Sequence, residues 1–343
     1  MLKAVIIGAT GYTGQELLRL LANHSKVTVT AVTSRGEAGK PLTDLFPQFF
    51  GHYDDLVFID PDDSRVLDCD VVFFATPHGT AHKYASQFLE AGLRVIDLSA
   101  DFRIKDQTLW ERWYGQPHGA PEYIEQAVYG LVEHNRDALK GAQLIAVPGC
   151  YPTAVQLAIL PALKTGLVAE QSIIADCKTG VSGGGRKASL PFHVCEASES
   201  MKPYALAGHR HEPEIEQGTA LFGQQATPVT FMPHLAPMIR GIEATCYLTL
   251  TGETDWQAVY EQAYSDQHFV KVLAQGQAPE TRHVRGSNFC QLSVMPKPEK
   301  QQLVVFSVID NLVKGAAGQA IQCFNVSYSF DEYEGINSIA MVP

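Results

Sequence analysis

The 343-residue sequence lacks the features that mark membrane and exported proteins. It contains no run of 18 or more apolar residues, which argues against a membrane-spanning helix. Its start, MLKAVIIGATG, carries one lysine and a short apolar run broken by glycine, unlike a signal peptide. The seven cysteines form no C-x-x-C pair and leave an odd one over, as is common in a reducing compartment. We therefore expect a cytoplasmic protein.

Positive charge is also scarce: the sequence has 26 Lys and Arg and 37 Asp and Glu, which gives a formal net charge of −11. This balance argues against general binding to nucleic acid or to acidic membranes. No set of three ligands shows the spacing of a metal site, so we expect no metal. An anionic substrate would need a local basic pocket, which directs attention to arginines in loops.

The first half of the chain alternates short apolar runs with helical patterns, such as Gly14–Ala22 and Thr80–Ala91. Alternation of this kind predicts βαβ units and a doubly wound parallel sheet covered on both faces. The expected strands are Ala4–Ile7, Val27–Val32, Val71–Ala75, Val95–Leu98 and Leu144–Val147.

The second half has longer β-rich runs and one long loop, Thr179–His211, rich in Gly, Ser, His and charge. The expected strands there are Ser172–Lys178, Pro228–Met232, Ile242–Thr251 and Leu303–Ile309. A chain of this length favours two domains. We expect the boundary near Cys150, with a final helix, Gly315–Phe324, returning to the first domain.

The glycine-rich start GATGYTG follows a predicted strand directly and opens a predicted helix. In that context glycines permit a tight turn and close backbone approach, and the helix N-terminus receives a pyrophosphate. The G-x-x-G-x-x-G spacing departs by one residue from G-x-G-x-x-G, and a purely structural turn is the alternative. The residues expected to bind a dinucleotide here are Gly8, Thr10, Gly11, Tyr12, Thr13 and Gly14.

The end of the second strand distinguishes the two nicotinamide cofactors. An NAD site carries Asp or Glu at this place to hold the ribose 2′-hydroxyl. Here Ser34 and Arg35 follow the strand, and a hydroxyl with a guanidinium suits a 2′-phosphate, which favours NADP. The alternative is that Arg35 is a solvated loop charge, and Glu37 nearby weakens the inference slightly.

The segment PGCYPT places Cys150 between two prolines, where an apolar run gives way to a helical pattern. The N-terminus of a helix stabilises an anion, so this position favours the nucleophilic thiolate. A proton-transfer partner is needed, and GHRHEPEI offers His209 and His211, with Glu214 to orient one of them. Spacing alone does not choose between the two histidines, and either has a surface or packing role as its alternative.

The loop KTGVSGGGRKAS combines Gly183, Gly184 and Gly185 with Arg186 and Lys187. Exposed backbone N–H groups beside cationic side chains form a suitable cradle for phosphate or carboxylate. A flexible surface loop is the alternative.

Taken together, these segments resemble the N-acetyl-γ-glutamyl-phosphate reductase family (type 1), which is related to aspartate-semialdehyde dehydrogenase. The resemblance spans nearly the whole chain in the expected order, and Val147, where many members have Asn, is its one small departure. The segments that carry it are GATGYTG, LSADFR (Leu98–Arg103), IAVPGCYPTAVQLAILP (Ile145–Pro161), SGGGRK, GHRHEPE and NLVKGAAGQA (Asn311–Ala320).

The resemblance implies two domains and an oligomer. Residues 1–149 with 313–343 would form a Rossmann-type NADP-binding domain. Residues 150–312 would form a mixed α/β domain of the glyceraldehyde-3-phosphate and aspartate-semialdehyde dehydrogenase C-terminal type, which carries catalysis and oligomerisation. We expect a homo-oligomer, a dimer or a tetramer.

The resemblance also implies a reaction. Cys150 would attack N-acetyl-L-glutamyl 5-phosphate, expel inorganic phosphate and form a thioester, which NADPH reduces to N-acetyl-L-glutamate 5-semialdehyde in arginine biosynthesis. By the family pattern His209 is the acid/base group, with His211 as second choice and Glu214 holding the imidazole. Thr76, Pro77 and His78 would line the cofactor groove, and Asn311 would meet the nicotinamide. The residues expected to bind substrate are Arg103, Ser182, Gly183, Arg186 and His211.

Three rival interpretations remain. A reductase of aspartyl or carrier-linked aminoadipyl phosphate would share the cysteine, histidine and cofactor site and differ only in the pocket. A non-catalytic NADP-binding regulatory protein would be expected to lack the nucleophile or the base, yet Cys150, His209 and Arg186 are all present. A hydrolytic cysteine enzyme would leave the N-terminal glycine motif without a purpose.

Overall fold

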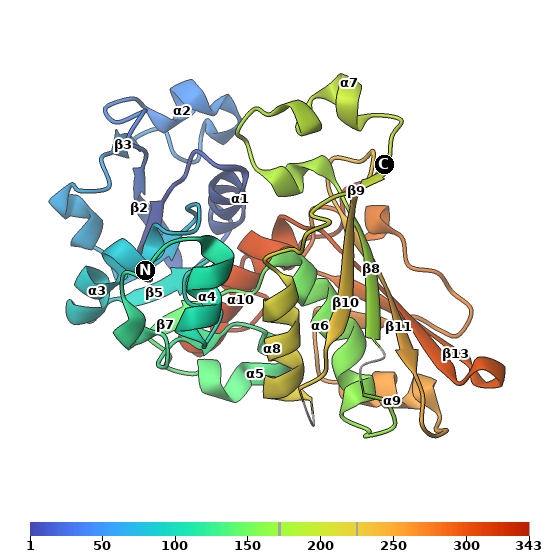
Figure 1. Ribbon diagram of the computed structural model, residues 1–343. Coiled ribbons are helices and arrows are strands. Elements are labelled where there is room, and N and C mark those ends of the chain that lie inside the picture. Colours follow the sequence, from blue (N-terminus) through green and yellow to red (C-terminus); the bar gives the residue numbers. More distant parts are fainter. Residues whose placement is uncertain (171–172, 224–225, 343) are drawn as a thin grey trace. The chain divides into compact units, whose positions relative to one another are not determined.

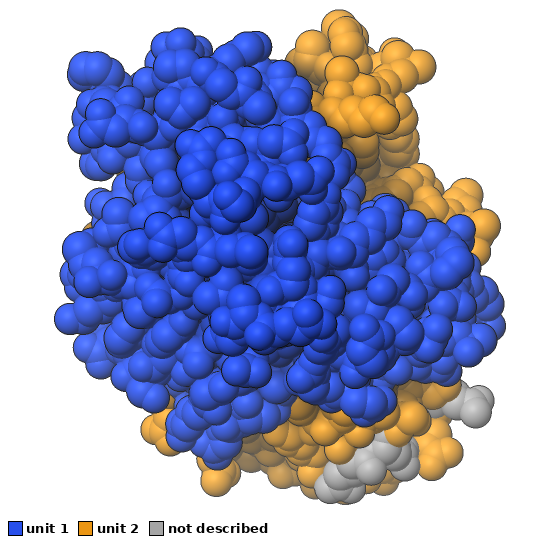
Figure 2. Space-filling view, turned by 90° about the vertical axis from the view of Figure 1, so that its left-hand side faces the viewer, with its two compact units in different colours: residues 1–148, 316–337 blue, residues 149–315, 338–343 orange. Residues whose placement is uncertain are grey.

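The computed structural model describes residues 1–170, 173–223 and 226–342, and the chain divides into two compact units (Figure 2). Unit 1 comprises Met1–Pro148 and Ala316–Asn337. Unit 2 comprises Gly149–Gly315 together with the C-terminal residues from Ser338 onward. We expected the whole C-terminal stretch in the first domain, but its end belongs to unit 2, where the N–H of Met341 donates to the carbonyl of Arg285 at 2.8 Å.

The strands of unit 1 form one sheet in the order β3-β2-β1-β4-β5-β7-β6, and every neighbouring pair is parallel. Figure 1 labels β2, β3, β5 and β7 of this sheet. Their bounds are β1 Leu2–Ile7, β2 Val27–Thr33, β3 Phe58–Ile59, β4 Val71–Phe74, β5 Arg94–Asp97, β6 Val128–Tyr129 and β7 Leu144–Ala146. The strand order reverses between β1 and β4, which is the topological switch point where doubly wound sheets bind ligands. The predicted fold class is confirmed, and the five predicted strands are present within one or two residues of their expected ends.

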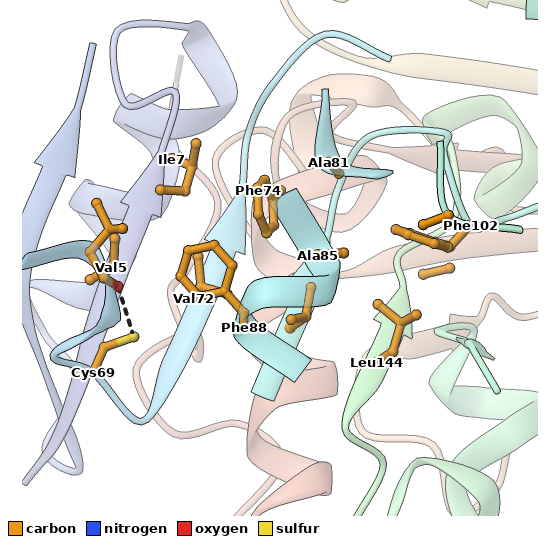
Figure 3. Packing of buried hydrophobic residues seen from close by; sticks show 14 of the residues in the cluster. Val5, Ile7, Cys69, Val72, Phe74, Ala81, Ala85, Phe88, Phe102 and Leu144 are labelled. Atoms are coloured by element: carbon orange, nitrogen blue, oxygen red, sulfur yellow. Dashed lines mark hydrogen bonds between the residues drawn. The ribbon is translucent and has the colours of Figure 1, made fainter. Parts of the chain in front are cut away.

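Helices cover both faces of this sheet. Their bounds are α1 Tyr12–Leu21, α2 Leu42–Leu45, α3 Ala81–Glu90, α4 Gln107–Tyr114, α5 Val132–Leu139 and α10 Gly318–Ser327, with single 3₁₀ turns at Pro47–Phe49, Ser64–Leu67 and Pro121–Tyr123. Phe74 of β4 packs with Phe88 of α3 on one face (Figure 3), whereas its neighbour Phe73 meets Phe324 of α10, with ring centroids 5.9 Å apart. Because consecutive strand residues point to opposite faces, a sheet buried on both sides needs the continuous apolar runs seen in the sequence.

Unit 2 contains a mixed sheet in the order β12-β13-β14-β11-β8-β10-β9. Its strands are β8 Ile173–Thr179, β9 Lys202–Pro203, β10 Val229–Leu235, β11 Ile242–Thr249, β12 Val270–Val272, β13 Cys290–Lys297 and β14 Gln302–Ile309. Ser172, where we expected the first of these strands to begin, lies outside the described residues; the strand is present from Ile173. Strand β10 continues three residues beyond its predicted end at Met232, and β13 was not predicted separately.

The helices of unit 2 pack on one face of that sheet or lie in its loops. They are α6 Cys150–Leu163, α7 Val194–Ala197, α8 Glu212–Phe222 and α9 Trp256–Ala263, with 3₁₀ turns at Val181–Gly184, Leu190–Phe192, Thr281–His283 and Pro298–Lys300. A π-helical turn, Val313–Ala317, precedes α10, so the predicted final helix begins three residues later than expected. Among the described residues, no helix is long and apolar enough to cross a membrane.

Helix α6 is the central helix of unit 2 and is apolar on all sides, as expected of a helix surrounded by other elements. It packs against β11, β14, α8 and α9. Pro161 has no N–H to bind the carbonyl four residues earlier, at Leu157, and the hydroxyl of Tyr264 donates to that carbonyl instead, at 2.6 Å. The proline is therefore tolerated, and α6 holds its first residue, Cys150, on a rigid support.

Candidate active site

Cys150 is the first residue of α6, and Gly149 before it is the N-cap residue, in an extended conformation (φ −66°, ψ 159°). Cys150 is partly exposed, whereas five of the other six cysteines are buried. The remaining one, Cys195, is exposed on the short helix α7. A thiol at the N-terminus of a 14-residue helix feels the positive end of the helix dipole, which favours the thiolate.

Gly315 of the π-helical turn packs directly against the cysteine. A Cβ atom at this position would lie 2.8 Å from the Cβ of Cys150, too close for any residue but glycine. The turn is held by the N–H of Gly315, which donates to the carbonyl of Asp310 at 2.9 Å. Sequence reasoning did not single out Gly315, although it lies in the segment NLVKGAAGQA that contributed to the resemblance.

His209 lies in an aromatic cluster together with the residue that follows the cysteine. Its ring centroid is 5.7 Å from that of Tyr151, 5.7 Å from Tyr204, 4.8 Å from His211 and 5.4 Å from Phe231. Burial in this cluster, helped by the charge of Arg210, lowers the pKa of His209 to about 4. His209 is therefore neutral at physiological pH.

The hydrogen bonds of His209 indicate where its proton lies. Nδ1 accepts a hydrogen bond from the backbone N–H of His211 at 3.0 Å. A neutral imidazole that accepts at Nδ1 carries its proton on Nε2. Within the described residues Nε2 of His209 has no hydrogen-bond partner, so this N–H is available to donate.

Tyr204 was not predicted, and it joins the histidine to the start of α6. Its hydroxyl donates to the hydroxyl of Tyr151 at 3.0 Å, and its backbone N–H donates to the carbonyl of Pro233 at 3.1 Å. Burial raises the pKa of both tyrosines. The only sequence signal for this pair was the position of Tyr151 next to Cys150.

Glu214, which we expected to hold an imidazole, binds the backbone at the start of α6. Its side chain is 1% exposed, and Oε1 accepts a hydrogen bond from the N–H of Gly149 at 2.7 Å. Helix α8 presents Glu214 to α6 because Nε2 of Gln156 donates to the carbonyl of Glu214 at 3.0 Å. Gly218, one turn further on, leaves the room that the Gln156 side chain occupies. An orienting contact between Glu214 and a histidine stays a prediction.

The loop that we expected to bind substrate begins at a firmly held turn. The hydroxyl of Ser182 accepts a hydrogen bond from Nδ2 of Asn311 at 2.9 Å, and Oδ1 of Asn311 accepts one from the N–H of Gly241 at 2.8 Å. Asn311 is only 2% exposed, so its amide joins two loops of unit 2; a contact with the nicotinamide stays a prediction. Gly183, within this turn, and Arg186, beyond it, are exposed.

The glycine-rich turn of unit 1 uses its three glycines differently. Gly8 has φ +88°, and a Cβ there would lie 2.7 Å from the carbonyl oxygen of Ala75, while a Cβ at Gly14 would lie 2.6 Å from Cα of Ala9. At Gly11 the nearest atom to an added Cβ is 3.8 Å away, so the fold itself does not require a glycine. Thr10 and Thr13 of the same turn are half-buried, and Tyr12 is 39% exposed.

Arg35 follows β2 and is exposed. Its Nη2 donates to the hydroxyl of Tyr84 at 2.5 Å, and that hydroxyl donates to Oδ1 of Asp62 at 2.9 Å. The N–H of Ser34 is bound to the carbonyl of Ile59 at 3.1 Å. Arg35 is thus oriented by a tyrosine from α3, a contact that sequence reasoning did not foresee.

The loop after β4, which carries Thr76 and Pro77, is anchored by a buried acid from LSADFR. Oδ1 of Asp101 accepts from the N–H of Gly79 at 2.7 Å, and Oδ2 accepts from the N–H of His82 at 3.1 Å. Asp101 is fully buried, and Thr76 is half-buried beside exposed Pro77. The acid therefore fixes the loop expected to line the cofactor groove.

Arg103, which we expected to bind substrate, has its guanidinium bound to backbone. Nε donates to the carbonyl of Val147 at 2.7 Å and Nη2 to the carbonyl of Leu98 at 2.8 Å. The residue is 7% exposed. In unit 1 the arginine therefore holds the end of β7, which precedes Cys150 in the chain; its contact with substrate stays a prediction.

Comparison with known proteins agrees with this organisation. A family model described as the NAD binding domain of semialdehyde dehydrogenase matches residues 3–142, and one described as the dimerisation domain matches residues 150–311. Curated N-acetyl-gamma-glutamyl-phosphate reductases from Ectopseudomonas mendocina (strain ymp) and Azotobacter vinelandii are each 55% identical over 344 residues, with 100% of both chains covered. The chain belongs to the N-acetyl-γ-glutamyl-phosphate reductase family.

Solved structures more distant from this reductase family share its fold. Aspartate semialdehyde dehydrogenase II from Vibrio cholerae, complexed with ASA, superposes with a TM-score of 0.74 at 16% identity, covering 95% of this chain and 98% of that one. The Candida albicans aspartate semialdehyde dehydrogenase with NADP has a TM-score of 0.70 at 18% identity, covering 95% and 98%. At such low identity the likeness shows the fold alone, and it confirms the predicted fold class.

Proposed function

We propose that the protein catalyses the NADPH-dependent reduction of N-acetyl-L-glutamyl 5-phosphate to N-acetyl-L-glutamate 5-semialdehyde and inorganic phosphate, a step of arginine biosynthesis. The observation that carries the proposal is a partly exposed Cys150 at the N-terminus of α6, followed by a tyrosine that packs against neutral His209. The full-length relatives with the same reductase name support the choice of substrate.

The residues of unit 1 fit a nicotinamide dinucleotide. The turn at Gly8, Gly11 and Gly14 has one glycine that the fold does not require, which is accounted for if a ligand approaches the backbone closely at Gly11. Exposed Arg35, held by Tyr84, supplies a guanidinium for a 2′-phosphate and favours NADP over NAD. When bound, NADPH would supply the hydride that reduces the acyl group.

Cys150 would carry the acyl group between the two halves of the reaction. Its thiolate attacks the acyl carbon, the C–S bond forms, and the bond to phosphate breaks with release of inorganic phosphate. A thioester is a better hydride acceptor than a carboxylate because sulfur donates little electron density to the carbonyl. After reduction the C–S bond breaks and the aldehyde is released. Cys150 becomes a thiolate again at the N-terminus of α6, where the helix dipole stabilises its charge.

His209 would act as a hydrogen-bond donor during this reaction. Its Nε2–H is available and its Nδ1 is occupied by the N–H of His211, so in the resting protein it is arranged to donate rather than to accept. A donor aimed at the carbonyl oxygen stabilises the charge that develops on each tetrahedral intermediate. His211 is the second choice for this role.

The substrate's anionic groups would meet the 182–186 loop. We propose contact with Ser182, Gly183 and Arg186 ahead of Arg103, because the guanidinium of Arg103 is bound to two carbonyls and nearly buried. We further propose a homo-oligomer, since residues 150–311 match a dimerisation domain, and a cytoplasmic location, where a thiol nucleophile stays reduced.

The experiment that tests this proposal is the reverse reaction followed by NADPH absorbance. N-Acetylglutamate semialdehyde, NADP and phosphate are supplied, and aspartate semialdehyde replaces the first aldehyde in a parallel assay. We expect phosphate-dependent formation of NADPH with the N-acetylated aldehyde and little with the other. Activity confined to aspartate semialdehyde would transfer the chemistry to a different acyl phosphate, and activity with neither would refute the proposed function.

A further inference from the structure

The contact between Glu214 and Gly149 places a carboxylate at the helix end that carries the nucleophile. Oε1 of Glu214 accepts from the N–H one residue before Cys150, at 2.7 Å, and the side chain is 1% exposed. A negative charge near a thiol opposes loss of its proton, whereas the N-terminus of a helix favours that loss. At Cys150 these two influences act against each other.

The same residue joins the histidine segment to the nucleophile's helix. Glu214 lies in the first turn of α8, three residues after His211, and its carbonyl accepts from Gln156 of α6. Its carboxylate then holds the N–H at the N-cap of α6. A shift of this contact would therefore move Cys150 relative to His209.

We propose that Glu214 is a positioning residue that fixes the start of α6 against the His209–His211 segment and, through its negative charge, limits the acidity of the Cys150 thiol. The proposal rests on the proposed function only in taking Cys150 as the nucleophile. It goes beyond the expected role of Glu214, because that role concerns a histidine and this one concerns the cysteine. A thiol whose ionisation is limited in this way reacts more slowly in adventitious alkylation and oxidation.

Other groups also face the thiol and stay constant in the test. Tyr151 and Tyr204 lie close enough that a charge on Cys150 adds to burial in raising the pKa of each phenol. Gly315 contacts the Cβ of Cys150 and carries no charge. His209, neutral at physiological pH, packs on both tyrosines.

The test measures the rate of iodoacetamide alkylation of Cys150 against pH, with the site of modification read by peptide mass spectrometry. The thiolate displaces iodide and forms a C–S bond, so the rate follows ionisation of the thiol without substrate or cofactor. In Glu214→Gln the amide oxygen still accepts from Gly149, but the charge is gone. We expect the midpoint of the profile to fall by about half a unit to one unit.

Glu216→Gln is the matched control. Glu216 lies on the same helix, and its Oε1 accepts a backbone N–H from Val229 at 3.1 Å, so this variant removes an equal charge from a similar contact elsewhere. We expect a much smaller shift of the midpoint. Equal shifts in both variants, or no shift in Glu214→Gln, would overturn the proposal.

Glu214→Asp separates the charge from the contact. The shorter side chain keeps the charge but withdraws it from Gly149, so we expect kcat to fall about tenfold or more with KM and the alkylation midpoint nearly unchanged. Unchanged kcat would contradict the positioning role, and this variant decides that point should Glu214→Gln not fold. If wild type lacks reductase activity but the alkylation profiles shift as expected, the proposed function fails, and the inference that the charge of Glu214 limits the acidity of Cys150 stands.

Discussion

His118 in unit 1 and His209 in unit 2 share the same local arrangement and differ in the hydrogen bonding of one ring nitrogen, Nε2. Each accepts at Nδ1 the backbone N–H of the residue two positions later: Ala120 at 3.2 Å for His118, and His211 at 3.0 Å for His209. Each ring packs edge-on against aromatic neighbours, Trp110 in the first case and Tyr151 in the second. The tautomer with the proton on Nε2 follows for both.

The two histidines differ in the hydrogen-bond partner of the proton on Nε2. Nε2 of His118 lies 2.7 Å from the carbonyl of Asp101, an acceptor only, so its N–H is used within unit 1. Nε2 of His209 has no partner among the residues that the structure describes. Burial and aromatic packing are therefore shared by both histidines, and the hydrogen bonding of Nε2 is what sets His209, the proposed hydrogen-bond donor, apart from His118.

The largest expected effect comes from removing the nucleophile that His209 is proposed to assist. Cys150→Ser should lower reductase activity by about 10⁴-fold or more, because a serine hydroxyl does not ionise at neutral pH and no other group in the proposed mechanism can take its place. Thermal unfolding and NADPH binding should stay near wild type. Cys195→Ser, which changes the exposed cysteine of unit 2, is the control and should keep full activity. Substantial turnover by Cys150→Ser would refute the assignment.

Substitution of each histidine by asparagine tests the comparison itself. An asparagine oxygen can replace Nδ1 as acceptor but offers nothing at the place of Nε2. His209→Asn should therefore lower kcat by about 10²- to 10⁴-fold with little change in the free energy of unfolding. His118→Asn should lower that free energy by about 1–3 kcal/mol, because the buried carbonyl of Asp101 loses its donor.

The measurements are steady-state kinetics and urea unfolding of both variants. A variant His209→Asn that loses stability and keeps activity would reverse the comparison. His211→Asn should have a smaller effect on kcat than His209→Asn; the opposite ranking would assign the donor role to His211.

Arg35→Ala should weaken NADPH binding about 10- to 100-fold and NADH binding far less, because the charge-assisted hydrogen bonds to a 2′-phosphate are lost. Fluorescence titration with each nucleotide measures this difference. Arg65→Ala is the control, since Arg65 is an exposed arginine of the same unit paired with Asp63 at 2.6 Å. Equal losses for the two nucleotides in Arg35→Ala would mean that the guanidinium does not contact the 2′-phosphate.

The smallest expected effect concerns stability against pH. Burial lowers the pKa of His209 from 6.5 to about 4, so between these values the unfolded chain binds a proton that the folded chain does not. The stabilisation is present above pH 6.5 and is lost as pH falls toward 4. Between pH 7 and pH 4.5 the wild type should lose about 2 kcal/mol more than His209→Asn in chemical unfolding. Equal losses would show that His209 titrates normally.

The sequence was sufficient where the signal is local. The strand, glycine turn and helix at Gly8–Gly14 are contiguous, and so is the passage from β7 to a cysteine at the start of α6. Both could be predicted because hydrophobic periodicity and turn residues act over a few positions. The two-residue strands β3, β6 and β9 were not predicted, since two residues carry no pattern.

The sequence was insufficient where the site depends on segments far apart in the chain. Tyr204 meets Tyr151 across 53 residues and Glu214 meets Gly149 across 65, and no local pattern reports such pairs. Arg103 shows a second limit. Its position in a motif gives no sign of the two backbone carbonyls that its guanidinium binds, and these partners are known only from the fold.

The most direct test of the account is a rapid-mixing experiment with N-acetylglutamyl phosphate and no NADPH. If Cys150 forms a thioester before reduction, wild-type protein should release a stoichiometric burst of phosphate, and mass spectrometry after acid quenching should find the N-acetylglutamyl group on the Cys150 peptide. Cys150→Ser should show neither. No burst from the wild type, or an equal burst from Cys150→Ser, would contradict the central claim that this cysteine carries the acyl group.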